Sequence, residues 1–438
     1  MPDQTPTDAS NPLIDRRRFV VSAGSLAALG LFFGGGNVYA EEFTPAGTPG
    51  KANAAPVGCA VIGLGEQGRA VLTALSHAAG AQVKRICDTY EGIHDRALEL
   101  APKATAGTDA AEVFADPAVQ AVWICTPTHQ HKDLVLAALK AGKHVYCEAP
   151  LAHTIDDARA IAQAAAAAKS QVFHSGLHQR TSPQHLHVVK FIRTGALGTV
   201  AMGRAHWHKR TSWRRAAASD ERARALNWRL KKDTSLGLAG EIGIHQFDVA
   251  SWFLKELPVA VSGRGAIRAW KDGREVADTV QALLEFPEGL NVSYDATLAN
   301  TFDGTAETFF GTEAAVMLRD HRAWMFKEAD ATALGWEVYA YRDHIGDDTG
   351  IALVADATKI LAAGKKPGEN REVDPTRTAL VTAAEAFMEA IRAAVVSKQG
   401  ASACDALTGF QATVVAITTN QAITEGKRIA FTPEMFAL

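Results

Sequence analysis

Short apolar runs alternate with amphipathic stretches from Val57 to about residue 180, in the rhythm of strands and helices. The predicted strands are Gly58–Ile62, Gln82–Cys87, Val119–Cys125, His144–Cys147 and Gln171–His174. The predicted helices between them are Arg69–Ala79, Ile93–Leu100, Lys132–Ala141 and Ile155–Ala168. Strands that alternate with helices indicate a parallel sheet with right-handed crossovers. We therefore predict an α/β domain with a doubly wound sheet over residues 56–180.

The pattern changes after residue 180, where strand-like segments follow one another directly. These segments are Val200–Trp207, Val259–Trp270, Thr279–Phe286, Leu290–Thr297, Thr308–Gly311, Val316–Arg319 and Ala323–Lys327. Pro287-Glu288-Gly289 is the predicted turn of a hairpin. Consecutive strands with tight turns indicate a second, α+β domain over residues 181–438, with a large open mixed or antiparallel sheet. Residues 330–374 show no clear pattern, and helices are predicted at Ala379–Val396 and Ala406–Glu425.

The first forty residues have the pattern of an export signal. Paired arginines, Arg16 and Arg17, precede a short apolar run over Val20–Phe33, and small residues lie near Ala40. This order is typical of a cleaved signal, and the arginine pair favours the twin-arginine type. The alternative, an uncleaved anchor, is disfavoured because the run is short for about 30 Å of hydrocarbon. We predict a signal over residues 1–40, a flexible lead-in over 41–55, and a periplasmic protein with no membrane span.

Composition narrows the class of protein. Of 438 residues, 47% are hydrophobic and 21% are charged, which excludes a wholly disordered chain, a collagen-like chain and a coiled coil. The 45 basic and 48 acidic residues give a net charge of −3, so no overall attraction to nucleic acid or anionic membrane is expected. The five cysteines are few and mostly lie in or beside apolar runs, which argues against a disulfide framework.

A glycine-rich turn connects the first predicted strand to the first predicted helix. Gly63, Gly65 and Gly68 form a G-x-G-x-x-G pattern in this turn. The first glycine permits the tight turn, the second lets a pyrophosphate approach the backbone, and the third allows close packing of helix on strand. Leu64 and Gln67 lie in the same turn, and amide groups at the start of the helix would hold the phosphates. The turn predicts a dinucleotide site.

Asp88 ends the second predicted strand, 20 residues after Gly68. An acid at this spacing binds the ribose hydroxyls of a dinucleotide and repels a 2′-phosphate. The predicted cofactor is therefore NAD, with NADP less favoured. The alternative is a ligand-free sheet with an incidental surface acid.

Three further motifs resemble a known family. CTPTHQH at Cys125–His131 resembles the TPxxxH loop of the glucose–fructose oxidoreductase / inositol dehydrogenase (Gfo/Idh/MocA) family, and Gly142–Pro150 resembles its GKHVxxEKP segment. Leu238–Asp248 is similar to the family's GxxxDxGxHxxD segment. The resemblance runs from Val57 to the C-terminus. It implies a Rossmann NAD-binding domain, a C-terminal domain with an open sheet, and a cleft between the two. It also implies a homodimer or homotetramer formed through that sheet's outer face.

The resemblance assigns roles to residues in these motifs. Those it places at the cofactor are Thr126, Pro127, His131, Glu148 and Gln179, with Glu148 meeting the ribose next to the nicotinamide. One departure is large: Ala149 stands where the family has the lysine that normally relays the proton. Alanine has no ionisable group, so that role cannot be carried over. A smaller departure is Glu241, where the family more often has Asp.

Glu241 and His245 are the candidate catalytic residues. They are four residues apart, which places them on the same face of a helix. A neutral imidazole at His245 could accept a hydroxyl proton while hydride leaves the carbon, and Glu241 could orient the ring or hold a substrate hydroxyl. The alternative is an ordinary helical pair with a buried histidine, and the resemblance favours the catalytic interpretation.

Candidate substrate contacts are Arg180, Trp228 and Arg229, because aromatic faces pack on sugar rings and cations bond hydroxyls. The alternative for Arg180 is an ordinary surface charge, and the alternative for Trp228 and Arg229 is the edge of a strand with a partly buried tryptophan. His185-x-His187 and His206-x-His208 could each place two imidazoles on one face of a strand. No cysteine or carboxylate set completes either pair, so no metal site is predicted.

The favoured function is hydride transfer between a secondary alcohol of a sugar, glycoside or cyclitol and a tightly bound NAD. A second hypothesis is a glycosidase or lyase that oxidises a sugar carbon transiently, eliminates, and then returns the hydride. A third is a non-catalytic sugar-binding protein with a structural NAD. In each case the predicted partner is a small carbohydrate.

Overall fold

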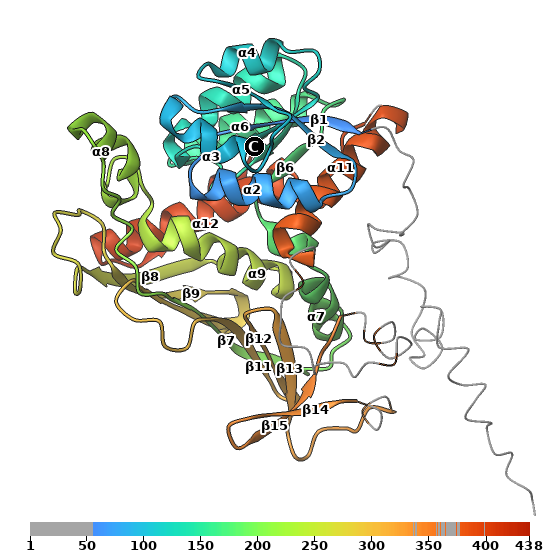
Figure 1. The fold of residues 1–438 in the computed structure, drawn as a ribbon. Coiled ribbons are helices and arrows are strands. Elements are labelled where there is room, and N and C mark those ends of the chain that lie inside the picture. The colour runs from blue at the N-terminus through green and yellow to red at the C-terminus, as the bar shows by residue number, and fades with distance from the viewer. Residues whose placement is uncertain are drawn as a thin grey trace, which may run out of the picture. The chain divides into compact units, whose positions relative to one another are not determined.

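The structure is a computed structural model. It describes residues 56–438 except positions 336, 338–339, 356, 358–359, 361–363, 365–373, 375–376 and 398. The predicted signal and lead-in therefore lie outside the described residues. The described chain contains two sheets with helices packed against them (Figure 1). Within this part of the chain, no helix has both the length and the apolar character needed to cross a membrane.

The first sheet is parallel, as the sequence predicts, and it has six strands: the five predicted ones and a short additional strand, β3 (Thr105–Gly107). Their order is β3, β2 (Ala81–Cys87), β1 (Val57–Ile62), β4 (Ala121–Ile124), β5 (His144–Cys147) and β6 (Phe173–Ser175). The strand order reverses between β1 and β4, and ligands of doubly wound folds bind beyond the carboxyl ends of the strands at this point. The Rossmann-type prediction is confirmed.

Helices cover both faces of the first sheet because its strands are apolar on both faces. One face packs on α2 (Glu66–His77), α3 (His94–Leu98) and α11 (Ala379–Ser397). The other packs on α4 (Ala110–Ala115), α5 (His131–Lys140), α6 (Ile155–Ala167) and the start of α12 (Ala406–Glu425). The chain therefore returns at its C-terminal end to complete the core of the N-terminal sheet.

The second sheet has ten strands. Their order is β14 (Arg342–Ile345), β15 (Asp348–Ala352), β13 (Arg322–Lys327), β12 (Ala314–Arg319), β11 (Thr305–Gly311), β7 (Val200–His208), β10 (Asn291–Thr297), β9 (Thr279–Glu285), β8 (Ala260–Ala266) and β16 (Ile429–Ala430). Strands β7 and β10 are parallel and the other neighbours are antiparallel, so the predicted open mixed sheet is confirmed. One apolar core joins this sheet to α7 (Pro183–Arg193), α9 (Ile244–Leu254) and α12. Two shorter helices, α8 (Asp220–Leu226) and α13 (Pro433–Phe436), complete the described set.

Two sequence predictions about strands are wrong. His185 and His187 lie on helix α7, which begins at Pro183, a residue that suits the first turn of a helix. Strand β8 ends at Ala266 and not at Trp270. The backbone amides of residues 268–270 donate to the carboxylate of Asp278, so they are withdrawn from strand pairing. Strands β14 and β15 lie in the stretch that showed no clear pattern.

A substitution in helix α11 can test whether this C-terminal helix packs on the first sheet. Phe387 is fully buried and meets Trp123 edge-on, with ring centroids 5.1 Å apart. Phe387→Ala should lower the free energy of unfolding by about 3–5 kcal/mol, the usual cost of removing a buried aromatic ring. Val396→Ala is the control, because Val396 is 85% exposed on the same helix. Urea unfolding of both variants measures the difference, and equal stabilities would contradict this packing.

Candidate active site

The glycine turn between β1 and α2 has the geometry that each glycine was predicted to provide. Gly63 has φ of 89°, and a Cβ there would lie 2.7 Å from the carbonyl carbon of Cys125. A Cβ on Gly68 would lie 1.9 Å from the carbonyl oxygen of Gly63, so helix and strand pack closely. Gly65 instead faces a large cavity, and no atom would lie within 4 Å of its Cβ. The turn therefore leaves room at Gly65 for a ligand to reach the backbone.

Asp88 lies beside this turn, directly after β2, and lines the cavity. Its Oδ2 accepts a hydrogen bond from the backbone amide of Leu64 at 2.8 Å, and its Oδ1 accepts one from the amide of Tyr90 at 2.9 Å. Leu64 itself is buried and contributes its backbone, not its side chain. These bonds fix the carboxylate at the rim of the turn, in the position of a ribose-binding acid.

Glu148 follows β5 and is buried on the same side of the cavity. Its Oε1 accepts a hydrogen bond from Nε2 of Gln67 at 3.0 Å, which joins the glycine turn to the end of β5. Burial raises the pKa of Glu148 to about 7, although the hydrogen bond from Gln67 opposes this shift. The carboxyl group can therefore hold or release a proton near neutral pH.

Buried polar atoms without partners mark the wall between these residues. The hydroxyl of Thr126 and Oε1 of Gln179 both line the cavity, and neither has a hydrogen-bond partner among the described residues. Pro127 lies beside Thr126 in the same wall. Unpartnered buried polar atoms call for a ligand or water, because each otherwise costs free energy. The open glycine turn, the fixed acid and these atoms fit NAD.

His131 has a different position from the one expected for a cofactor contact. It borders the cavity, but its ring is almost fully buried, with Nδ1 3.0 Å from the carbonyl oxygen of Pro150 and Nε2 2.9 Å from that of Thr126. The ring thus ties the segment after β4 to the segment after β5. Burial lowers the pKa of His131.

The opposite wall of the cavity comes from the second domain. A π-helical turn, Ala239–Gly243, precedes α9 and carries Glu241. Oε2 of Glu241 accepts a hydrogen bond from the hydroxyl of Thr128 at 3.1 Å, and Oε1 accepts one from the amide of Leu236 at 3.1 Å. Burial raises the pKa of Glu241, while the charge of Arg229 opposes that shift. Its carboxylate is thus engaged with Thr128 and Leu236, so the expected role of orienting the His245 ring has no support in these contacts.

His245 lies at the start of α9, on the cavity wall. Its Nδ1 is buried and has no hydrogen-bond partner among the described residues. The ring of His178 is its neighbour, with centroids 4.9 Å apart. Burial, helped by His178, lowers the pKa of His245 to about 3. The imidazole is therefore neutral at ordinary pH and able to accept a proton. Ala149 lines the same cavity and adds no ionisable group.

Of the three expected substrate contacts, Trp228 and Arg229 line the cavity. They lie on a 3₁₀ turn, Trp228–Leu230, and the guanidinium carbon of Arg229 is 4.6 Å from the centroid of the Trp228 ring. Arg180 is not part of the lining. Its guanidinium makes hydrogen bonds of 2.8–3.0 Å to the buried carboxylate of Asp248 on α9. The role of Arg180 in this structure is to neutralise the buried charge of Asp248, and it is not a residue of the candidate site.

Two further groups in the cavity were not expected from the sequence. His178 lines it from a 3₁₀ turn, His178–Thr181, and Glu307 lines it from β11. Burial raises the pKa of Glu307 to about 7, and Oε1 accepts a hydrogen bond from Nε2 of Gln246 at 3.0 Å. The sequence feature that could have identified Glu307 as a candidate is an acidic residue within a mostly apolar strand. No local pattern signalled His178.

The histidine pairs do not form a metal centre. His206 and His208 lie on one face of β7, with ring centroids 5.0 Å apart. Nε2 of His208 is 2.6 Å from Oδ2 of Asp295, and Nε2 of His206 is 3.3 Å from the carbonyl oxygen of Asp303. Across the described ranges, no group of three or more histidine, cysteine or acidic side chains is placed to hold a metal ion.

Together, the doubly wound sheet, the open glycine turn and the carboxylate of Asp88 beside it have the form of a dinucleotide-binding domain. Two family models match the chain: "Oxidoreductase family, NAD-binding Rossmann fold" over residues 57–176 and "GFO/IDH/MocA C-terminal domain" over residues 185–317. These matches cover more than half of the chain. The protein belongs to the GFO/IDH/MocA oxidoreductase family, as the sequence motifs predicted, and its N-terminal domain is an NAD-binding Rossmann domain.

Individual relatives show the breadth of this family. A levoglucosan dehydrogenase from Pseudarthrobacter phenanthrenivorans is 27% identical over 238 residues, which are 49% of this chain and 59% of that protein. A "Glycosyl hydrolase family 109 protein" from Shewanella baltica is 27% identical over 231 residues, 46% of this chain and 50% of that protein. The chain thus spans only about half to three-fifths of these relatives' length.

A solved structure shares the fold. Levoglucosan dehydrogenase in complex with NADH superposes with a TM-score of 0.69 at 21% identity, covering 86% of this chain and 99% of that one.

Gly65 provides a test of the dinucleotide turn. Gly65→Ala adds a methyl group where no protein atom lies within 4 Å, so the midpoint of urea unfolding should stay close to that of the native protein. Calorimetry should show NAD binding weakened by about tenfold or more, because the pyrophosphate must approach this backbone.

Gly68→Ala is the matched contrast, since its methyl group would meet the Gly63 carbonyl oxygen. This variant should lose about 1–3 kcal/mol of stability through overpacking. Native NAD affinity in Gly65→Ala would show that the dinucleotide does not bind at this turn.

Proposed function

We propose that the protein transfers hydride between a secondary hydroxyl carbon of a sugar, glycoside or cyclitol and bound NAD. The observation that carries this proposal is the pairing of two walls in one cavity of about 1900 Å³. One wall has the glycine turn, Asp88 and Glu148, and the other has His245 and Glu241. The cavity is larger than the roughly 300–1,000 Å³ of ordinary ligand pockets, which leaves space for a sugar beside a dinucleotide.

His245 is the proposed proton acceptor. Oxidation of a secondary alcohol releases the hydroxyl proton as well as the hydride from carbon, and the proton needs a base within hydrogen-bond reach. The neutral imidazole of His245 has a nitrogen lone pair to take that proton; its lowered pKa keeps the ring unprotonated but makes it a weaker base, and Ala149 offers no competing group. Bound NAD supplies the acceptor for the hydride. His178, whose ring lies against His245, is placed to share the proton.

The other residues position the reactants. Asp88 holds the ribose of the adenosine half, and Glu148 lies where the ribose next to the nicotinamide is expected. Trp228 and Arg229 offer an aromatic face and hydrogen-bond donors to a sugar ring, and Nε of Arg229 has no partner among the described residues. Glu241 keeps the two walls together through Thr128.

A redox-neutral glycosidase or lyase is the second candidate. The similarity to the Shewanella baltica glycosyl hydrolase family 109 protein and the alanine at position 149 favour it. In this route, oxidation at one carbon acidifies the neighbouring C–H bond, a base removes that proton, and the leaving group departs. Water or another nucleophile then adds, and the hydride returns to the carbon from which it came. Glu148 and Glu307, with pKa values near 7, are available for such proton transfers.

His245→Ala tests the proton acceptor. Turnover should fall by about 10²–10⁴-fold, the usual cost of losing a general base, while NAD stays bound. In the native protein, kcat/KM should show no ionisation of His245 between pH 5 and 9, because its pKa lies near 3. His321→Ala, at an exposed position outside the cavity, is the control and should keep full activity. Near-native turnover in His245→Ala with full NAD occupancy would remove His245 from the mechanism.

Purified protein mixed with candidate sugars in D₂O, without added NAD, separates the two candidate reactions. Net hydride transfer should raise absorbance at 340 nm and leave the sugar's neighbouring C–H bonds unexchanged. A redox-neutral cycle should release product with no lasting absorbance change and place deuterium beside the oxidised carbon. We expect the absorbance rise. Bound sugar without either change would instead support a non-catalytic binding protein.

Export through the twin-arginine route to the periplasm is a further proposal. It rests on Arg16 and Arg17 before the apolar run and on small residues near Ala40. Outside the cytoplasm no nicotinamide pool is available, so the cofactor would have to remain bound and be reset by the reaction or by a second substrate. Lysine at both arginine positions should leave the precursor in the cytoplasm, as fractionation would show. Continued export of that variant would contradict the proposal.

A further inference from the structure

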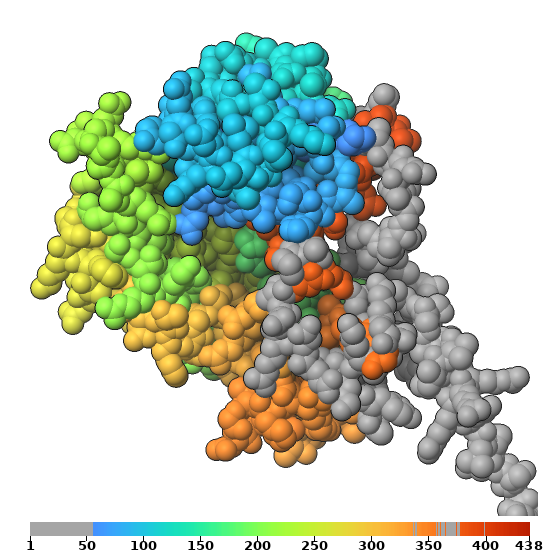
Figure 2. Space-filling model, in the orientation of Figure 1, coloured from blue at the N-terminus to red at the C-terminus, as the bar shows by residue number. Residues whose placement is uncertain are grey.

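A segment between β7 and the 3₁₀ turn at Trp228 crosses from the second domain towards the first (Figure 1). We call residues 211–227 the strap; they include helix α8. In Figure 2 its yellow-green atoms lie beside blue atoms of the first domain. Six strap residues line the cavity: Arg215, Ala216, Arg222, Arg224, Ala225 and Leu226.

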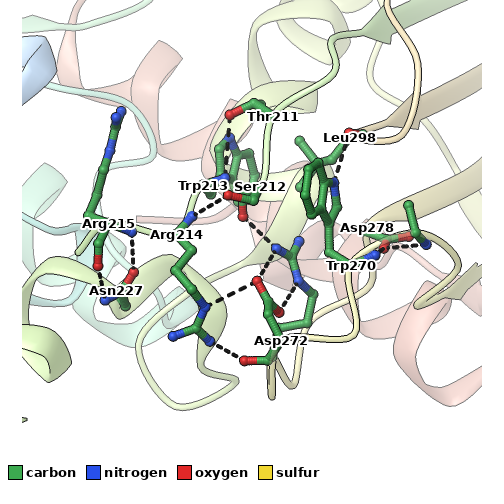
Figure 3. Close-up of polar contacts among 12 residues, drawn as sticks. Thr211, Ser212, Trp213, Arg214, Arg215, Asn227, Trp270, Asp272, Asp278 and Leu298 are labelled. Carbon is green, nitrogen blue, oxygen red and sulfur yellow. Dashed lines mark hydrogen bonds and ion pairs between the residues drawn. The ribbon is translucent and has the colours of Figure 1, made fainter.

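The root of the strap is anchored by buried charge. The guanidinium of Arg274, which has no exposed side-chain surface, donates to the carbonyl oxygen of Ser212 and pairs with Asp272 at 2.8 Å. Arg214 of the strap donates from Nε to the same carboxylate at 3.2 Å (Figure 3). Two guanidinium groups on one carboxylate hold the pKa of Asp272 well below its usual range. The strap therefore leaves the second domain from a fixed point.

Asn227 braces the rest of the strap. The residue is 7% exposed, and its Oδ1 accepts a hydrogen bond from the amide of Arg215 at 2.7 Å. Its Nδ2 donates to the carbonyl oxygen of Arg215 at 2.9 Å (Figure 3). It also donates to the carbonyl oxygen of Ala223 at 2.8 Å. These bonds join the loop to α8, so that the arginines of the two parts keep a fixed separation.

The tip of the strap contacts the first domain at two points. The guanidinium carbon of Arg222 lies 3.9 Å from the centroid of the Tyr90 ring, two residues beyond Asp88. Arg215 forms an ion pair with Glu66, the first residue of α2 after the glycine turn. One contact is thus beside the acid that faces the ribose, and the other is beside the turn that faces the pyrophosphate.

We propose that the strap holds the adenosine-diphosphate half of NAD in the cavity, and that NAD exchanges only when the Arg222–Tyr90 contact opens. Arg215, Arg222 and Arg224 line the cavity that the glycine turn also lines, and their positive charge suits a pyrophosphate. The Arg215–Glu66 pair is largely exposed and contributes little alone, so Arg222 on Tyr90 is the main closure. This role depends on the NAD-binding domain and not on the reaction proposed above.

Exchange of bound NAD for isotope-labelled NAD measures the closure without any turnover. Arg222→Ala and Tyr90→Ala should each speed exchange by roughly two- to five-fold, the range expected for a cation–π contact at an exposed ring. The double variant should exchange no faster than the faster single variant, because both substitutions remove the same contact. Tyr90→Phe keeps the ring and should exchange at the native rate.

Arg210→Ala is the matched control, because Arg210 is exposed, carries the same charge and lies outside the strap and the cavity lining. It should leave the exchange rate unchanged. Native exchange rates in both Arg222→Ala and Tyr90→Ala would overturn the proposal, and so would an equal acceleration in Arg210→Ala.

Limited proteolysis gives a second readout. Tryptic cleavage after Arg222 and Arg224 should be slower in the NAD-loaded native protein than in native protein stripped of NAD, and Tyr90→Ala should reduce that difference. Cleavage at these arginines that is indifferent to NAD would contradict the closure even if NAD binds normally.

Discussion

The hydrogen bond from Thr128 to Glu241 joins the two walls of the cavity, and the site depends on it. Thr128 follows β4 at the carboxyl edge of the first sheet, and Glu241 lies in the π turn before α9. Both side chains are buried, so separating them would leave Oε2 of Glu241 without a hydrogen-bond partner, at a cost of about 1–3 kcal/mol. The walls bearing Glu148 and His245 are thereby held in register. A short polar contact, and not apolar burial alone, thus fixes the distance over which hydride and proton would move.

Features that depend on local chain geometry could be predicted from the sequence. The alternation of strands and helices predicted the first sheet, and the run of consecutive strands predicted the second, because hydrophobic period and turn residues are properties of neighbouring positions in the chain. Gly63, Gly65 and Gly68 each have the environment that the motif implies, since φ above zero and close backbone approach exclude side chains. The position of Asp88 could be predicted because it comes directly after β2. Parallel strands bring their carboxyl ends to one edge of the sheet, so Asp88 had to lie near the glycine turn that follows β1.

Features that depend on distant segments could not be predicted. The sequence predicted that Arg180 would contact the substrate, but its partner is Asp248, which lies 68 residues further along the chain on α9. His178 meets His245 through the packing of a 3₁₀ turn on α9, which no spacing encodes. An amphipathic pattern in α11 indicates a buried face, but not that this face covers the N-terminal sheet. The strap reads as a polar loop, and its contacts with Glu66 and Tyr90 arise only in three dimensions.

The most direct test of the central claim is a crystal structure of the protein with reduced nicotinamide and the alcohol substrate, a pair that cannot react. We expect the substrate hydroxyl oxygen within about 2.6–3.2 Å of a ring nitrogen of His245. Its carbon should face the nicotinamide at about 3–3.5 Å. A substrate hydroxyl directed at Glu241 or at the space beside Ala149, with His245 out of hydrogen-bond reach, would contradict this account.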